Sequence, residues 1–468
     1  MDLLLKNATV VNEGQTFRGS VVVRGERISQ VLRQKDFASV KLYNEAVRNA
    51  ASLAETMDLE GLHVFPGMID THVHFREPGD GWAGNIESES KAAVLGGVTS
   101  FMDMPNNIPP ATSNALLEDK FASAEQTSYA NYSFYLGATG NNLDQIRSIR
   151  KKQVCGVKVF MGSSTGNLLV DRAEDMEDIF RYCRVPIAVH AEDNAVIASN
   201  LSAAIQRFSG SIPPQMHPKI RSRSACLKSS GLAVELALKH CARLHILHIT
   251  TKEEVQMLSQ VQNSGLITAE TCPSYLWFCS KDYRRYGNLI KCNPAIKDVE
   301  DMLELRKALK NGILQTVGSD HAPHLLKDKL KPYNQCPSGI PLIQYEMQMM
   351  LALAKEGVFA LADIAEKTSH NPARCFAIKD RGFIREGQYA DLAIADLSRP
   401  ASTDSPAAMC RWSPFSEEGI CIRGKDGKAK RKNGFPCSIV HTMVNGCFVV
   451  RNGLLTGKRR SRRLMFDR

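Results

Sequence analysis

The chain has 468 residues, of which 43% are hydrophobic and 23% charged, so its length suits a domain of roughly 250 residues plus a smaller one. This balance excludes a mainly disordered chain and a chain dominated by membrane spans. Much of the net charge of +10 falls in two basic runs, RGKDGKAKRK at 423–432 and KRRSRR at 458–463. Because neither run is interleaved with aromatic residues, we interpret them as a solvated loop and tail and do not expect a nucleic-acid partner.

The N-terminal segment and the cysteines indicate the compartment. MDLLLKNATVVNEG has a three-leucine run interrupted by Lys6, which is too short for a signal peptide or a membrane span. The thirteen cysteines include no CxxC pair, which favours reduced thiols in the core over a disulfide framework. We therefore expect a cytoplasmic protein without a membrane partner.

From about residue 62 to 324, short apolar, β-branched segments alternate with longer amphipathic ones, which is typical of repeated βα units. The expected strands are 63–75, 99–105, 132–138, 156–162, 186–192, 243–250, 266–273 and 314–323. Helical segments such as NIESESKAAVLGG, SACLKSSGLAVELALKH and DVEDMLELRKALKNG lie between them. Eight such strands predict a (β/α)8 TIM-type barrel, with its active site at the C-terminal ends of the strands.

The two flanks of this region differ from it. In residues 1–60, short strand-like segments alternate with turns. The same pattern returns after residue 385 in GQYADLAIADL and SIVHTMVNGCFVVRNG. We predict a small β-sandwich domain assembled from residues 1–60 and 385–468, with the barrel spanning 61–384.

Polar residues gather where the predicted strands end. In DTHVHFR, the side chains of His72, His74 and Arg76 project to one side of the first strand, because alternate residues of a strand share a face. Two adjacent imidazoles are a starting point for a transition-metal site.

Four further strands carry a polar residue at or near the same end of the barrel: Lys158, His190, His248 and Asp320. His245 falls on the opposite face of its strand, and we leave it out of the site. A lysine ammonium has no lone pair for a metal. Lys158 is therefore either a Schiff-base nucleophile or, after taking up carbon dioxide, a carbamate that bridges two metals. The four histidines and the aspartate favour the carbamate.

The segments HVHFREPG, GVKVFMGSSTG, AVHAED, ILHIT and GSDHAPH resemble the amidohydrolase superfamily and, within it, the class I dihydroorotases. The resemblance extends to WSPF at 412–415 and the terminal MFDR. It implies reversible ring closure of N-carbamoyl-L-aspartate to L-dihydroorotate in pyrimidine synthesis.

The resemblance also implies the ligands of two zinc ions. One is expected on His72, His74, carboxylated Lys158 and Asp320, and the other on Lys158, His190 and His248. Metal binding lowers the pKa of water from ~16 to ~7, which supplies a hydroxide nucleophile near neutral pH. Asp320 would then carry the proton to the departing amide nitrogen.

Four residues match family positions that contact the substrate: Arg76, Asn106, Asn293 and His324. The guanidinium of Arg76 suits the carboxylate of dihydroorotate, although a structural ion pair is an alternative role. The chain departs from the family at DGWAGN after REPG and at CPSYLWF after the seventh strand, which puts the substrate loops in question.

Two alternatives remain open. An allantoinase or a dihydropyrimidinase would share the metal site, but its substrate lacks a carboxylate for Arg76. A catalytically silent scaffold relative would be expected to have lost metal ligands, whereas all six are present. Dimers are common in the family, and no sequence feature identifies the interface.

Overall fold

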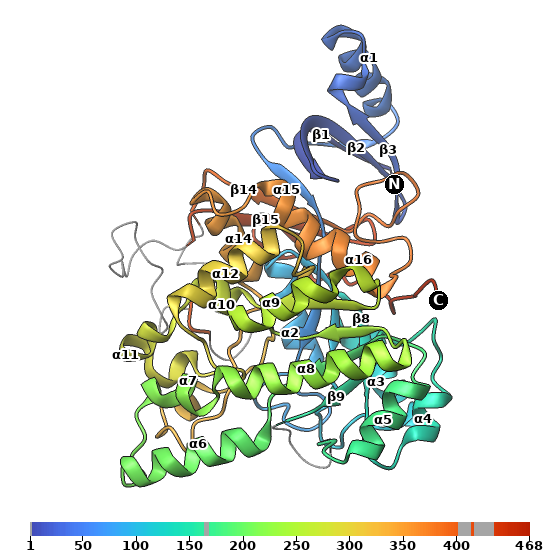
Figure 1. Cartoon of the computed structure of the whole chain (residues 1–468). Coiled ribbons are helices and arrows are strands. Elements are labelled where there is room, and N and C mark those ends of the chain that lie inside the picture. Colours follow the sequence, from blue (N-terminus) through green and yellow to red (C-terminus); the bar gives the residue numbers. More distant parts are fainter. Residues whose placement is uncertain (1, 163–167, 401–412, 416–434) are drawn as a thin grey trace.

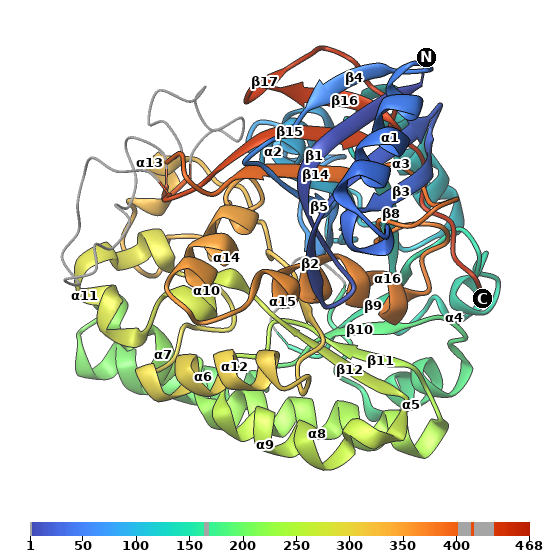
Figure 2. The same ribbon diagram turned by 90° about the horizontal axis from the view of Figure 1, so that it is seen from above.

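The computed structural model describes residues 2–162, 168–400, 413–415 and 435–468. The chain forms a barrel and a second sheet that joins both chain ends (Figures 1 and 2). The basic run at 423–432 and Trp412 lie outside the described residues, as do 163–167 of the GVKVFMGSSTG segment. No helix in the described ranges has the length and apolar character needed to cross a bilayer.

Eight strands form the barrel in chain order, each parallel to the next. They are β6 (Met68–Val73), β7 (Val98–Asp103), β8 (Asn131–Gly137), β9 (Gly156–Phe160), β10 (Ile187–His190), β11 (Leu244–Ile246), β12 (Ile267–Thr271) and β13 (Thr316–Val317). A parallel bridge between Val73 and His321 brings the two edge strands together, and His74 N donates to His321 O at 2.8 Å. The predicted barrel is confirmed.

Three strands end elsewhere than predicted. The expected strand 63–75 is split at Gly67, because β5 (His63–Pro66) belongs to the second sheet. A Cβ at Gly67 would lie 2.2 Å from Thr99 Oγ1, so only glycine fits where the chain passes from one sheet to the other. β11 and β13 are shorter than expected, and the chain leaves the strand before His248 and Asp320.

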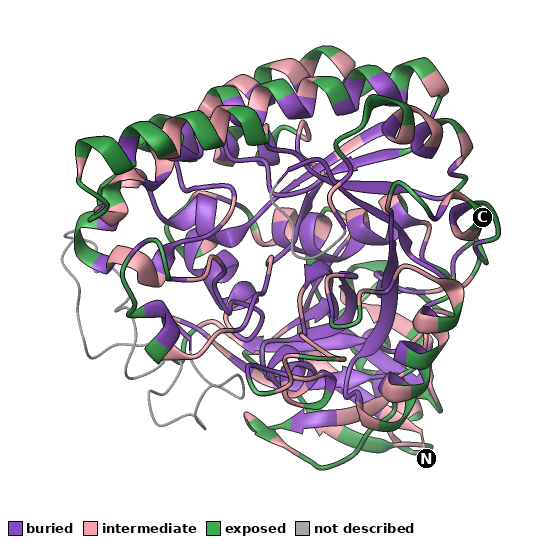
Figure 3. Cartoon of the chain, turned by 90° about the horizontal axis from the view of Figure 1, so that it is seen from below, coloured by how far each residue is buried: buried purple, intermediate pink, exposed green. Residues whose placement is uncertain are grey.

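Helices cover the outside of the barrel, and their outer faces are exposed while the strands are buried (Figure 3). The helices up to the eighth strand are α2 (Ile86–Leu95), α3 (Asn114–Thr127), α4 (Leu143–Arg147), α5 (Ala173–Tyr182), α6 (Asn194–Arg207), α7 (His217–Ile220), α8 (Arg223–His240), α9 (Lys252–Val261), α10 (Pro273–Trp277), α11 (Tyr283–Tyr286) and α12 (Val299–Lys310). After β13 come α13 (Leu326–Lys329), α14 (Glu346–Lys355), α15 (Leu361–Ala365) and α16 (Asn371–Phe376). The three quoted helical predictions are confirmed by α2, α8 and α12.

The second sheet has nine strands and mixes both ends of the chain, as predicted. Its N-terminal strands are β1 (Leu3–Asn12), β2 (Gln15–Arg24), β3 (Arg27–Arg33), β4 (Glu55–Asp58) and β5. Its C-terminal strands are β14 (Leu392–Asp396), β15 (Ser438–Val444), β16 (Cys447–Arg451) and β17 (Leu454–Leu455). Antiparallel pairing of β5 with β14 joins the two sets.

One helix within residues 1–60 was not expected. α1 (Val40–Ala51) begins after Ser39, whose side chain accepts from Leu42 N, and it buries Tyr43 and Val47. These two residues lie four apart on one face and pack with Leu4 and Val22 of the sheet.

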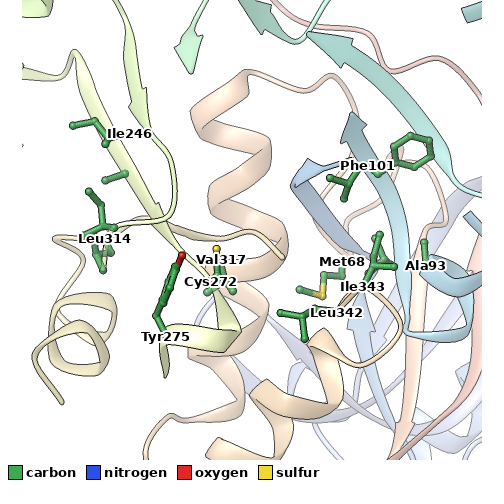
Figure 4. Packing of buried hydrophobic residues seen from close by; sticks show 14 of the residues in the cluster. Met68, Ala93, Phe101, Ile246, Cys272, Tyr275, Leu314, Val317, Leu342 and Ile343 are labelled. Atoms are coloured by element: carbon green, nitrogen blue, oxygen red, sulfur yellow. The ribbon is translucent and has the colours of Figure 1, made fainter. Parts of the chain in front are cut away.

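The main core fills the space between the barrel strands and the helices. Figure 4 shows part of it, in which Met68 and Ala93 lie on one side and Cys272 and Val317 on the other. All eleven cysteines in the described ranges are free thiols, and most are buried, as expected of reduced cysteines used for packing.

Basic side chains of the C-terminal run are exposed, as expected, at Lys458, Arg459, Arg460 and Arg462, but the run is not a free tail. Residues 458–468 run along the N-terminal end of β8, where Tyr132 N donates to Arg462 O at 3.1 Å and Leu464 N donates to Tyr132 O at 2.8 Å. Arg463 pairs with Glu118 at 3.0 Å and covers the Phe121 ring at 3.4 Å. The side chains of Leu464 and Phe466 are fully buried against the floor of the barrel.

Candidate metal centre

Three of the predicted ligands meet at the junction of the first and last strands. His72 Nε2 lies 3.2 Å and His74 Nε2 lies 3.1 Å from Asp320 Oδ1. Within the described ranges, His72, His74 and Asp320 are the group of histidine, cysteine and acidic residues whose ligand atoms all fall within 4.8 Å of one another. Imidazole nitrogens and a carboxylate oxygen are a donor set that suits zinc.

His72 is oriented from behind by a buried carboxylate. Its Nδ1 lies 2.7 Å from Glu270 Oε1 on β12, and Thr71 Oγ1 donates to Glu270 Oε2 at 2.8 Å. With its proton on Nδ1, His72 presents Nε2 as a lone pair toward Asp320. Burial opposes ionisation of Glu270, but the neighbouring His72 and His245 hold its pKa well below the usual range.

His74 is oriented in the same way by an amide. Its Nδ1 lies 2.7 Å from Asn106 Oδ1, on the loop after β7. That loop is fixed by a buried lysine, because Lys120 Nζ donates to Asp103 Oδ2 at 2.6 Å and to Asn107 Oδ1 at 2.7 Å. The predicted substrate residue Asn106 therefore also sets the direction of a predicted metal ligand.

The other two histidines form a pair on the opposite side of the mouth. His190 Nδ1 lies 2.9 Å from His248 Nε2, so both nitrogens point to one place. His190 Nε2 lies 3.0 Å from Glu192 Oε2, although not in the direction of a hydrogen bond. Glu192 is fully buried and forms an ion pair with Arg221, which is 7% exposed.

Lys158, on β9, lies close enough to both groups of ligands for its charge to act on Asp320 and on His190. It is 1% exposed, and its Nζ lies 4.6 Å from the centre of the Phe160 ring. Burial lowers the pKa of Lys158 to about 7, although the charges of Asp320 and Glu270 oppose this shift. A substantial fraction of the side chain is therefore a neutral amine at pH 7, the form that reacts with carbon dioxide.

Three of the histidines are kept neutral by burial. Burial lowers the pKa of His74 to about 4 and holds those of His190 and His248 below the usual value. Neutral imidazole is the form that binds metal. The ring centres of His72 and His248 are 5.3 Å apart, so the two groups of ligands face each other across the mouth.

Backbone strain coincides with the site. Arg76, His248 and Asp320 have φ values of 67°, 42° and 48°, in the left-handed region that non-glycine residues rarely adopt. Each lies just after a barrel strand, where the chain turns to aim a side chain at the mouth. Such strain persists where surrounding contacts fix it, and it clusters at functional sites.

Asp70, the acid that opens the DTHVHFR motif, has a structural role. Its Oδ1 accepts from His72 N and from Ser319 N, both at 3.0 Å, and its Oδ2 accepts from Ser319 Oγ. Asp70 therefore braces β6 against the segment that carries Asp320.

Arg76 and His324 lie beside this centre. Arg76 Nη2 is 3.4 Å from His324 Nε2, and His324 Nε2 donates to Ser338 O at 3.0 Å. Because that nitrogen already carries a proton, it cannot accept from Arg76, and the guanidinium remains available. No carboxylate of the described chain pairs with Arg76. Asn293 Oδ1 is a buried acceptor without a hydrogen-bond partner among these residues.

Sequence reasoning missed the residues that support the ligands: Glu270, Glu192, Arg221, Lys120 and Asp103. The signal for Glu270 was its position as an acid within the apolar strand LITAETCP. A buried carboxylate is unfavourable because it loses its hydration, unless a partner compensates for this loss. The excluded His245 is not at the mouth, but its Nε2 lies 3.3 Å from Glu270 Oε2.

Comparisons with known proteins agree with this arrangement. Residues 63–449 match the amidohydrolase family. The chain is 29% identical over 411 residues to a dihydroorotase of Methanothermobacter thermautotrophicus, covering 87% of this chain and 88% of that protein. It is also 30% identical over 479 residues to an allantoinase of Deinococcus radiodurans, covering 99% of this chain and 98% of that protein.

Among solved structures, the L-hydantoinase (dihydropyrimidinase) of Arthrobacter aurescens superimposes with a TM-score of 0.86 at 24% identity, covering all of both chains. The dihydropyrimidinase of Brevibacillus agri gives a TM-score of 0.83 at 23% identity over the same coverage. These two similarities establish the fold.

Proposed function

Because the chain belongs to the amidohydrolase family and is a cyclic amidohydrolase, we propose that its substrate pair is L-dihydroorotate and N-carbamoyl-L-aspartate. The observation that carries this choice is Arg76, a half-buried guanidinium two residues after the predicted metal ligand His74 and free of any carboxylate partner in the described chain. A half-buried cation without a counter-ion has lost part of its hydration and favours an anionic ligand. Dihydroorotate has a carboxylate that a planar guanidinium can bind through two hydrogen bonds.

We propose that two zinc ions are held by the ligands described above, with carboxylated Lys158 shared between them. Bound zinc would polarise the ring carbonyl and lower the pKa of water. Lys158 would join the two ligand groups into one centre, which is supported by its lying close enough for the charge of its amino group to lower the pKa of Asp320, His190 and His248 alike.

Asp320 is proposed as the proton carrier. Burial opposes its ionisation, but His72 and His74 hold the pKa of its carboxyl below the usual value, so it starts as a base. Both histidines contact Oδ1, which leaves Oδ2 to take a proton from the attacking water and return it to the leaving ring nitrogen. Arg76 would hold the substrate carboxylate, and Asn293 and His324 would contact the ring.

An allantoinase is the second candidate, and a specific observation favours it. The allantoinases of Deinococcus radiodurans and Bacillus velezensis match 99% and 97% of this chain at 30% identity, whereas the Methanothermobacter dihydroorotase matches 87%. Allantoin has no carboxylate, so this candidate leaves Arg76 without a ligand. A cytoplasmic location and a homodimer complete the proposal.

The test is turnover of L-dihydroorotate, allantoin and dihydrouracil by the purified, zinc-supplemented protein, before and after chelation. We expect chelator-sensitive turnover of dihydroorotate alone. Arg76→Lys should raise KM for dihydroorotate while zinc content stays unchanged. Preference for allantoin or dihydrouracil would refute the proposed substrate, and loss of zinc in Arg76→Lys would make Arg76 a structural residue.

A further inference from the structure

Two buried lysines lie next to the proposed substrate residues. Lys329, at the end of α13, is 1% exposed, and Lys291, two residues before Asn293, is 8% exposed. Neither pairs with a carboxylate in the part of the chain that the structure describes. A buried ammonium without a counter-ion must be stabilised by hydrogen bonds.

Lys329 uses all three of its donors on backbone carbonyls. Its Nζ donates to Lys291 O at 2.9 Å, to Pro337 O at 3.0 Å and to Gly339 O at 2.9 Å. Gly339 N in turn donates to Lys291 O at 2.9 Å. Lys329 therefore ties residues 337–339 to the segment that carries Asn293.

Lys291 binds the other end of the same loop. Its Nζ donates to Tyr333 O at 2.8 Å and to Cys336 O at 2.6 Å, and it lies 4.3 Å from the centre of the Tyr333 ring. Together the two ammonium groups hold four carbonyls of residues 333–339, which we call the clamped segment.

The clamped segment contacts His324. Ser338 O accepts the proton of His324 Nε2 at 3.0 Å, and a Cβ at Gly339 would lie 2.9 Å from the same nitrogen. The backbone at 338–339 thus fits closely against the imidazole, and any shift of this backbone moves His324 relative to Arg76, 3.4 Å away.

We propose that Lys291 and Lys329 are positioning residues, which hold the clamped segment so that His324 and Arg76 keep their relative places, Arg76 to bind an anionic group of the substrate and His324 to contact its ring. The inference rests on the proposed function, in which that group is the carboxylate of dihydroorotate. The two ammonium groups also contribute positive potential on the side of the mouth where the anion binds. Burial lowers the pKa of Lys329 only to about 8, so it remains largely charged at pH 7.

The experiment compares Lys329→Met with Lys327→Met, an exposed lysine of the same helix that serves as the matched control. Amide hydrogen exchange of the clamped segment is measured without substrate, and KM, kcat and zinc content are measured with L-dihydroorotate. For Lys329→Met we expect exchange at Cys336 and Gly339 and KM each to rise about tenfold, because three carbonyls lose their shared donor. We expect kcat to change by less than about threefold and zinc content to stay unchanged. Lys327→Met should match the wild type.

Wild-type exchange and KM in Lys329→Met would overturn the inference. So would a fall in kcat with loss of zinc, which would mean that the lysine supports the metal centre instead. If Lys329→Met does not fold, Lys291→Met is measured in the same way, with an expected rise of about threefold in exchange and KM. Exchange requires no substrate, so a wild type inactive on dihydroorotate would refute the proposed function alone, while unchanged exchange would refute the clamp alone.

Discussion

The two histidine pairs at the mouth of the barrel are supported in different ways. The Nδ1 atom of His72 lies against Glu270, and the Nδ1 atom of His74 lies against Asn106. Both histidines present Nε2 to Asp320. His190 and His248 instead contact each other at 2.9 Å. The first pair is oriented by hydrogen bonds to side chains behind it. The second pair is buried and lies next to the ion pair of Glu192 and Arg221.

This difference predicts that the two ligand groups bind their cations in different ways. The first group already has a carboxylate among its ligands and could hold a cation on its own side chains. The second offers only neutral nitrogens, so a negative ligand must come from elsewhere, and in the proposed centre carboxylated Lys158 supplies it. The second site should therefore depend on Lys158 more strongly than the first.

Replacing Lys158 should have the largest effect. We expect Lys158→Ala to lose roughly 10³-fold in turnover, because the proposed anionic bridge between the two ligand groups is gone. Elemental analysis should show at least the second zinc missing, and small carboxylates such as acetate should restore part of the activity. Wild-type zinc content and turnover would contradict the role of Lys158.

The ion pair behind the second histidine pair comes next. Glu192→Gln should destabilise the protein by about 3–5 kcal/mol, because it leaves the buried guanidinium of Arg221 without its counter-ion. Denaturant unfolding measures this effect. The exposed pair of Lys91 and Glu87 offers a control, since Glu87→Gln should change the unfolding free energy by less than about 0.5 kcal/mol.

The carboxylate behind the first pair should act on metal binding. Glu270→Gln should weaken zinc affinity about 10- to 100-fold, because the amide is a weaker acceptor for His72 Nδ1. Competition with a chromogenic chelator gives the affinity. Glu254→Gln, a buried acid bonded to Ser230 and Thr251 away from the centre, controls for the general cost of changing a buried glutamate. Equal zinc affinity in both variants would refute the orienting role.

The smallest effect is expected at Thr71, which contacts Glu270 and not the histidine ligand itself. Thr71→Val removes a single hydrogen bond to Glu270 and should cost about 1 kcal/mol of unfolding free energy. Zinc affinity should fall by less than about threefold, because the contact between Glu270 and His72 remains. A loss of zinc affinity as large as that in Glu270→Gln would contradict this prediction. It would show that the hydrogen bond from Thr71 is needed to hold the Glu270 carboxylate against His72.

The sequence was sufficient for the barrel and for placing His72, His74 and Asp320 at one end of it, since strand periodicity and strand-end position are local patterns. It was insufficient for their supports. Glu270 and His72 are 198 residues apart, and their contact depends on barrel closure. Residues 458–463 look like a solvated tail because their partners are distant in sequence: Glu118 lies 345 residues from Arg463. The helix α1 was missed because two buried positions are a weak signal within strand-like sequence.

The path of residues 458–468 also bears on how the protein is made. Leu464 and Phe466 pack with Ile69, Met102 and Tyr135, which are translated more than 300 residues earlier. During synthesis, the floor of the barrel cannot reach its final packing until residue 466 has emerged from the ribosome. Until then, apolar side chains of the earlier strands stay exposed to solvent. Folding of this barrel is therefore completed only after residues 458–468 have been translated.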